Sequence, residues 1–100
     1  MENIKQQLIG EIKERIEEVR EEIKKSDEEI KIWEAKIKVE NRMSNLKDLP
    51  SEIAEDVKYS ILGLESMLIM EQNRNLELAK DLKILEYREK IVNKMEKEEL

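Results

Sequence analysis

Acidic side chains are the most prominent candidates for chemistry in this sequence of 100 residues. Near the N-terminus they form one cluster, which consists of Glu14, Glu17, Glu18, Glu21 and Glu22. Residues 17–21 have the form EExxE, and helix-borne carboxylates of this kind can hold metal ions when they project into a shared pocket. On a helix, however, Glu17, Glu18 and Glu21 would lie opposite the apolar residues of the same segment. The spacing therefore predicts solvated charge here, with no metal site.

The sequence lacks the other common catalytic groups. It contains no His and no Cys, which removes the most frequent general base, the nucleophilic thiol and the most frequent metal ligands. It also has no glycine-rich phosphate loop and no Ser placed beside a base. We predict that the protein has no catalytic, cofactor-binding or metal-binding residues and is not an enzyme.

Composition and charge restrict the fold class and the partners. Charged residues make up 44% of the chain, whereas it contains two Gly, one Pro and no Phe, which is typical of long helices. The net charge of −6 is spread over interspersed signs without a basic block, so we expect no nucleic-acid partner. The longest apolar run, residues 67–70, is far shorter than the roughly 20 residues of a membrane span, and the polar faces are too acidic for a membrane-surface helix. We expect an all-α, cytoplasmic protein.

Apolar residues step by three and four along both halves of the chain. In the first half they are Ile9, Ile12, Ile16, Val19, Ile23, Ile30, Trp33 and Ile37, interrupted by Ser26. In the second half they are Ala54, Val57, Ile61, Leu64, Leu68, Leu78, Leu82, Leu85 and Val92, interrupted by Glu71, Asn75 and Glu89. We call these two rows the seams. A spacing that averages 3.5 residues is typical of coiled coils, so we predict one helical domain over residues 1–100, with helices over about 3–46 and 51–98.

Pro50 separates the two predicted helices. It cannot donate a backbone hydrogen bond and its ring would clash with the carbonyl group of Leu46, so we predict a turn over about 47–51. The alternative is one long helix that is merely kinked. The polar interruptions favour an antiparallel hairpin, because folding the chain back pairs residues whose numbers sum to 97 or 98. Ser26 then lies beside Glu71, and Ile23 lies beside Asn75, so the polar gap of the first seam meets that of the second. We predict that Ser26, Glu71 and Asn75 form a polar layer that fixes the register of the helices.

Further apolar residues remain outside the seams, mostly toward the turn. The ones that we predict to form an oligomer or partner surface are Ile32, Val39, Leu62, Met67, Ile69, Met70 and Leu76. Soluble monomers rarely leave such a patch in water, so we expect a coiled-coil-like hairpin that dimerises into a four-helix bundle. The alternative is a break in the second helix near residues 72–75, with the C-terminal part folded inward as a third helix. Trp33 is predicted to be a core residue that faces Leu64, fitted where Gly63 carries no side chain.

These features favour a non-catalytic coiled-coil module for protein–protein interaction. We expect it to bind itself, most simply as a homodimer, and another protein, in the manner of an assembly factor, an adaptor or a phage-type inhibitor. The alternative function is a small-ligand site for a nucleotide or a metal, or an enzyme site, between subunits around Ser26, Glu71, Arg74 and Asn75.

Overall fold

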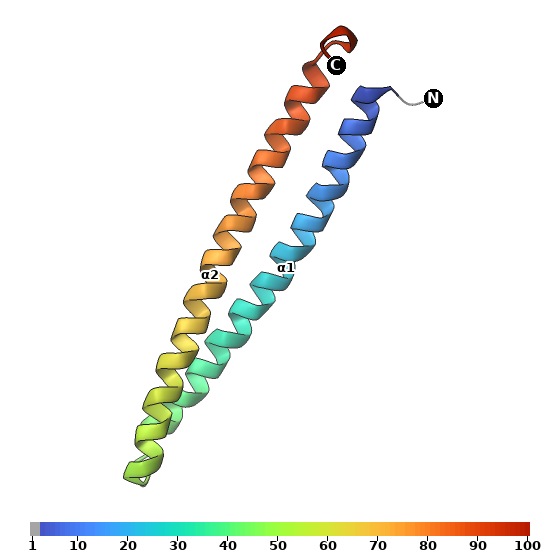
Figure 1. Cartoon of the computed structure of the whole chain (residues 1–100). Coiled ribbons are helices and arrows are strands. Elements are labelled where there is room, and N and C mark those ends of the chain that lie inside the picture. Colours follow the sequence, from blue (N-terminus) through green and yellow to red (C-terminus); the bar gives the residue numbers. More distant parts are fainter. Residues whose placement is uncertain (1–2) are drawn as a thin grey trace. The chain divides into compact units, whose positions relative to one another are not determined.

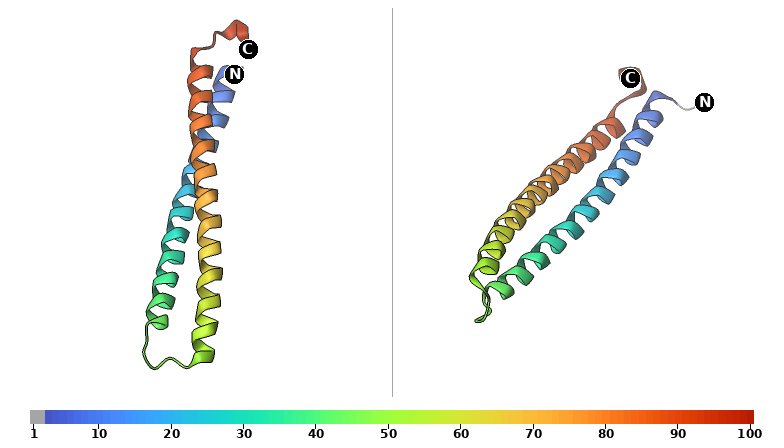
Figure 2. Two further views of the ribbon diagram at one scale, coloured as in Figure 1. Left: turned by 90° about the vertical axis from the view of Figure 1, so that its left-hand side faces the viewer. Right: turned by 60° about the horizontal axis from the view of Figure 1, so that its bottom comes forward.

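The computed structural model describes residues 3–100 and consists of two long helices and one short one. Helix α1 spans Ile4–Ser44, helix α2 spans Ser51–Lys94, and the 3-10 helix η1 spans Lys97–Glu99. Helices α1 and α2 pack against each other in opposite directions, as Figures 1 and 2 show. The predicted all-α antiparallel hairpin is therefore confirmed, and the alternative of one kinked helix is wrong.

Local hydrogen bonds account for the start of α1 and for the turn. The side-chain oxygen of Asn3 accepts a hydrogen bond of 2.8 Å from the backbone N–H of Gln6, which is an N-cap. Helix α1 ends at Ser44, and the next two N–H groups donate to carbonyl groups only three residues earlier, so the last turn tightens. Helix α2 begins directly after Pro50, whose carbonyl group accepts a hydrogen bond of 2.9 Å from Ala54. Proline is tolerated there because its missing N–H would have had no helical partner.

Helix α2 is continuous from Ser51 to Lys94, including residues 72–75, where the sequence left open a break. It ends four residues earlier than the predicted boundary near 98. The ammonium group of Lys5 donates hydrogen bonds of 3.0 Å to the backbone carbonyl groups of Asn93 and Met95. These bonds satisfy carbonyl groups that the end of α2 leaves without helical partners.

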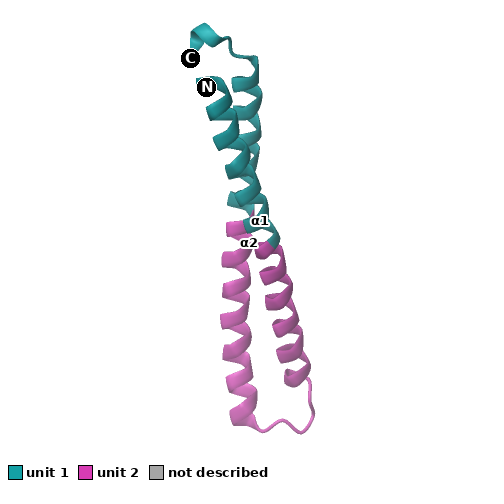
Figure 3. Cartoon of the chain, turned by 90° about the vertical axis from the view of Figure 1, so that its right-hand side faces the viewer, with its two compact units in different colours: residues 1–24, 76–100 teal, residues 25–75 magenta. Residues whose placement is uncertain are grey.

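The chain divides into two compact units, which Figure 3 distinguishes by colour. Unit 1 consists of Met1–Lys24 and Leu76–Leu100, and unit 2 consists of Lys25–Asn75. Each unit contains part of α1 and part of α2. Each unit is therefore held together by contacts between a segment of α1 and a segment of α2. In unit 2 the turn also joins these two segments directly.

Unit 1 contains the hydrophobic core. Ile16, Val19, Leu78 and Leu85 are buried together, and Ile12, Ile23 and Leu82 pack against them. All of these residues belong to the two seams that the 3.5-residue spacing identified. Because two helices alone can enclose only a narrow strip, the core is one seam wide.

Unit 2 buries its seam less completely. Its buried side chains are Ser26, at 0% exposure, and Val57, at 4%. The remaining apolar seam residues of the unit, apart from exposed Ala54, are only half-buried, and they are Ile30, Trp33, Ile37, Ile61, Leu64 and Leu68. Neither long helix contains a stretch apolar enough to cross a lipid bilayer within residues 3–100.

Candidate interaction surface

A polar contact between the helices lies inside unit 2. The side-chain amide of Asn75 donates a hydrogen bond of 3.2 Å to the hydroxyl group of Ser26 and one of 2.8 Å to the carboxylate of Asp27. Ser26 is completely buried, and this bond satisfies its hydroxyl group. The contact pairs residues whose numbers sum to 101, whereas the predicted sum was 97 or 98, so the predicted register was wrong by about one helical turn.

The sequence placed Glu71 directly beside Ser26, but the described hydrogen bond of Ser26 is made with Asn75. The carboxylate of Glu71 lies 3.6 Å from the guanidinium group of Arg74, three residues further along the same helix. The side chain of Glu71 is only 14% exposed, whereas that of Arg74 is 53% exposed. The observed register lets Asn75 reach a hydroxyl group and a charged acceptor together, and a hydrogen bond to a charged acceptor is stronger than one between neutral groups.

Trp33 borders an open groove rather than a closed core. It is half-buried, and the groove, which holds about 280 Å³, is lined by Glu29, Trp33, Met67, Met70, Glu71 and Arg74. The ammonium group of Lys36 lies 4.6 Å from the centre of the Trp33 ring, in a cation–π contact. The predicted fit of Trp33 against Gly63 is wrong, because a Cβ atom at position 63 would meet no other atom within 4 Å.

The seven residues of the predicted partner surface are all exposed in a single chain, by 42–68%. Six of them belong to unit 2, and Leu76 belongs to unit 1. Among the described residues, unit 2 exposes nine large apolar side chains, which are Ile32, Val39, Leu46, Ile53, Tyr59, Leu62, Met67, Ile69 and Met70. Unit 1 exposes Ile4, Leu76, Ile84, Tyr87 and Ile91. The unit with the less complete seam therefore also has the larger number of uncovered apolar side chains.

This surface occupies two different faces of α2. Met67 and Met70 border the groove of Trp33, whereas Leu62 borders a second groove of about 400 Å³ together with Ser44, Ala54, Lys58, Ile61 and Glu65. Adjacent residues of an α-helix point about 100° apart, so Ile69 and Met70 face different directions. One partner helix packed along α2 could not cover both faces.

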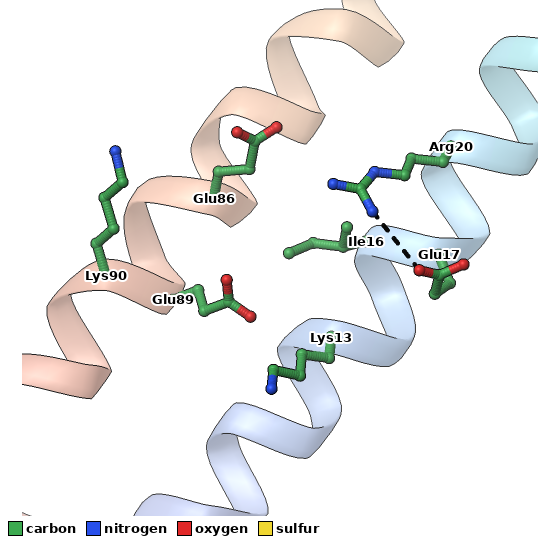
Figure 4. Close-up of a pocket in the computed structure, with 7 residues that line it drawn as sticks. All are labelled: Lys13, Ile16, Glu17, Arg20, Glu86, Glu89 and Lys90. Carbon is green, nitrogen blue, oxygen red and sulfur yellow. Dashed lines mark ion pairs between the residues drawn. The ribbon is translucent and has the colours of Figure 1, made fainter.

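In unit 1, a groove of about 370 Å³ carries charges of both signs (Figure 4). Its lining residues are Lys13, Ile16, Glu17, Arg20, Glu86, Glu89 and Lys90. Figure 4 shows Ile16 directed toward α2 and Glu17 paired with Arg20, at 3.6 Å. Three basic and three acidic groups nearly cancel, so the groove does not select a ligand of one charge.

Arginines pair with carboxylates of the acidic cluster near the N-terminus. Arg15 lies 2.9 Å from Glu18 and 3.4 Å from Glu22. The hydrogen bond to Glu18, together with the charge of Glu22, raises the pKa of the Arg15 guanidinium above its usual range. No group of three or more metal-binding side chains occurs in the described part of the chain.

The sequence and the fold were compared with known proteins. The chain matches no protein-family model, and neither a curated protein nor a solved structure is detectably similar to it. Function must therefore be inferred from the surface of the hairpin itself.

Proposed function

We propose that this protein is a non-catalytic coiled-coil module for protein–protein interaction that self-associates through unit 2. Two hairpins would together form a four-helix assembly, most simply a homodimer with two-fold symmetry. The observation that supports this best is the exposure of nine large apolar side chains on the unit whose own seam is only half-buried. The apolar face that remains free in the dimer would bind a second protein, as in an assembly factor, an adaptor or an inhibitor.

The energetics are consistent with association at micromolar concentration. Complete burial of a Leu, Ile or Met side chain contributes about 1.5–3 kcal/mol, so a half-exposed one still has about 1 kcal/mol to gain. A micromolar Kd corresponds to about 8 kcal/mol. Association also costs at least about 4 kcal/mol of rotational and translational freedom, so a micromolar Kd requires the burial of about six such residues from each copy. Unit 2 exposes nine of them.

The first test is the mass of the protein in solution. We expect sedimentation velocity or light scattering at micromolar concentration to give twice the chain mass of 12.0 kDa, with a shift toward the monomer on dilution. A mass of 12.0 kDa throughout the micromolar range, with normal solubility, would contradict self-association.

A small-ligand site between subunits is the second candidate function. The groove beside Trp33 supports it, because an aromatic ring, two carboxylates and a guanidinium group line about 280 Å³, close to the lower limit for ligand pockets. A panel of nucleotides and divalent metals tests it by thermal shift. A specific ligand at a hundredfold excess over its Kd would raise the apparent stability by about 2.7 kcal/mol, and a flat response across the panel would count against this function.

A further inference from the structure

One row of exposed residues on α2 runs parallel to its seam. We call it the outer stripe, and it consists of Asp56, Ser60, Gly63, Met67, Met70 and Arg74. All six residues are exposed, and they are separated by alternating steps of four and three residues. Each residue directly precedes one of the seam positions, so the outer stripe lies about 100° around the helix from the seam. In a four-helix bundle each helix packs against two neighbours, and the outer stripe lies on the side of α2 where a second neighbour would pack.

The outer stripe is complementary to a second copy of itself that runs in the opposite direction. Read from its two ends, it pairs Asp56 with Arg74, Ser60 with Met70, and Gly63 with Met67, and the residue numbers of each pair add to 130. An acid therefore opposes a base, and a small residue opposes a long, flexible one in both remaining pairs. Antiparallel packing of two identical helices about a two-fold axis creates these oppositions, because each residue then faces the one at the mirrored position.

We propose that a second copy of this chain occupies the outer stripe, with the two α2 helices antiparallel and the two-fold axis at the level of residue 65. This inference rests on the proposed function, since it specifies how the self-association is made. Gly63 of each copy then receives Met67 of the other, and Asp56 of each copy pairs with Arg74 of the other. The symmetry makes every contact twice.

Gly63 has no explanation within one chain. Glycine in the interior of a helix costs about 1 kcal/mol relative to alanine, and such residues usually mark a kink or a close contact. Here α2 is continuous and a Cβ atom at position 63 would meet open space. The approach of Met67 from a second copy supplies the missing close contact.

The charged ends of the outer stripe are free to pair between copies. Asp56 is exposed and forms no ion pair with another residue of the described chain. Arg74 is 53% exposed and lies 3.6 Å from Glu71 through one terminal nitrogen. A guanidinium group has five N–H donors, so Arg74 can retain Glu71 and still bind Asp56 of the second copy.

A lysine on α1 decides which helix makes the contact. Because Ser26 lies opposite Asn75, the level of residue 65 on α2 corresponds to Lys36 on α1. Contact between the two α1 helices about the same axis would bring two Lys36 ammonium groups together. Each of them instead lies 4.6 Å from its own Trp33 ring. We therefore place the contact along the α2 helices.

The two glycines of the chain provide a matched steric test. Gly10 and Gly63 both lie inside helices, and a Cβ atom added at either position would have no neighbour within 4 Å. We expect Gly63→Leu to raise the Kd of the dimer by about tenfold or more, the usual effect of overpacking, and Gly10→Leu to change it by less than about threefold. Sedimentation equilibrium gives both values, and circular dichroism checks that both variants remain helical. Equal Kd values for the two variants would overturn the inference.

Two neighbouring apolar residues test which face of α2 contacts the second copy. Met70 and Ile69 are 62% and 56% exposed, but only Met70 belongs to the outer stripe. Met70→Glu should dissociate the dimer, whereas Ile69→Glu should leave its Kd within about threefold of the original value, because Ile69 points about 100° away. The opposite result, or equal dissociation by both variants, contradicts the proposed pairing.

Charge exchange tests the register. Asp56→Lys should raise the Kd by about tenfold, because each dimer contains two of these pairs, and Asp56→Lys combined with Arg74→Glu should restore it to within about threefold. A double variant that associates more weakly than Asp56→Lys alone overturns the inference. If the wild-type protein is dimeric and any of these variants gives the contrary result, self-association stands and only the proposed pairing of the α2 helices is wrong. If the wild-type protein is monomeric, both self-association and the proposed pairing are wrong.

Discussion

Ser26 and Asn75 illustrate how two side chains fix the register of two long helices. Ser26 is completely buried, and the side-chain amide of Asn75 donates a hydrogen bond to its hydroxyl group. A buried polar group that loses its partner costs about 1–3 kcal/mol, whereas replacement of both partners by apolar groups is nearly neutral. Any register of the two helices that separates Ser26 from Asn75 is therefore less stable, because it leaves the buried hydroxyl group without a hydrogen bond.

At this scale we predict that Asn75→Ala lowers the free energy of unfolding by about 1–3 kcal/mol, because the Ser26 hydroxyl group then has no partner. Ser26→Ala combined with Asn75→Leu should recover most of that loss. Urea unfolding at one fixed protein concentration measures both changes, since association adds to apparent stability. Asn73→Ala, at an exposed position of the same helix, is the control. A double variant as unstable as Asn75→Ala would contradict the role of the pair.

At the scale of elements, the sequence predicted the helices well and their register poorly. The seam positions from Ile9 to Ile37 and from Val57 to Val92 are buried or half-buried as expected, and only Ala54 is exposed. The register shift of three or four residues could not be predicted for a physical reason. Sliding one helix by three or four residues, about one turn, brings the next residue of the same seam to each seam position, so Asn75 takes the place of Glu71. Hydrophobic periodicity is nearly unchanged by this slide, so it cannot distinguish the two arrangements, whereas the hydrogen bond of Asn75 to Ser26 does.

The candidate surface could be predicted only in part, for a similar reason. The spacing of Ile32, Val39, Leu62 and Ile69 predicted apolar residues outside the seam, and these are exposed. Which of them share a face depends on how α1 is positioned beside α2. The spacing of apolar residues within one helix does not determine that position. The groove at Trp33 was missed because the predicted register placed Leu64, rather than Met67 and Met70, near the indole ring.

Pro50 provides a prediction about the turn. The apolar spacing continues nearly in phase across the turn, so a single continuous helix would retain both seams. A proline in the interior of such a helix costs about 3 kcal/mol, and Pro50→Ala should therefore shift the equilibrium toward the open form by about a hundredfold. Spin labels at the exposed positions 13 and 88, in a labelled chain diluted with unlabelled protein, would report a larger separation as swapped dimers form. Asp48→Ala, which keeps the proline, should not change the separation, and an unchanged distance in Pro50→Ala would contradict the prediction.

At the scale of the whole molecule, the two units differ in how much they depend on association. Unit 1 has a buried cluster of its own, whereas unit 2 has half-buried seam residues and nine exposed apolar side chains. Local stability follows the density of buried apolar contacts. A dilute, monomeric sample should therefore open more readily in unit 2 than in unit 1.

We predict that hydrogen exchange measured by mass spectrometry shows this difference directly. In dilute protein, residues 25–75 should exchange faster than residues 3–24 and 76–94. Raising the concentration into the dimeric range should slow exchange in residues 25–75 selectively, because the second copy covers that unit. Met70→Glu is the control, and its exchange should not depend on concentration. A uniform change across both units in the wild-type protein would contradict the proposed location of the interface.

The contact of Lys5 with the carbonyl groups of Asn93 and Met95 has a consequence for engineering of the chain. It holds the first turn of α1 against the segment that follows α2, and Asn3 and Leu100 border the same surface hollow. A linker of a few residues could therefore join these two positions, and new ends could be opened between residues 46 and 49 without cutting either helix. Such a circularly permuted hairpin would present its free ends in unit 2, the unit that contains the proposed interface, where an attached fluorophore would test for the arrival of a second copy.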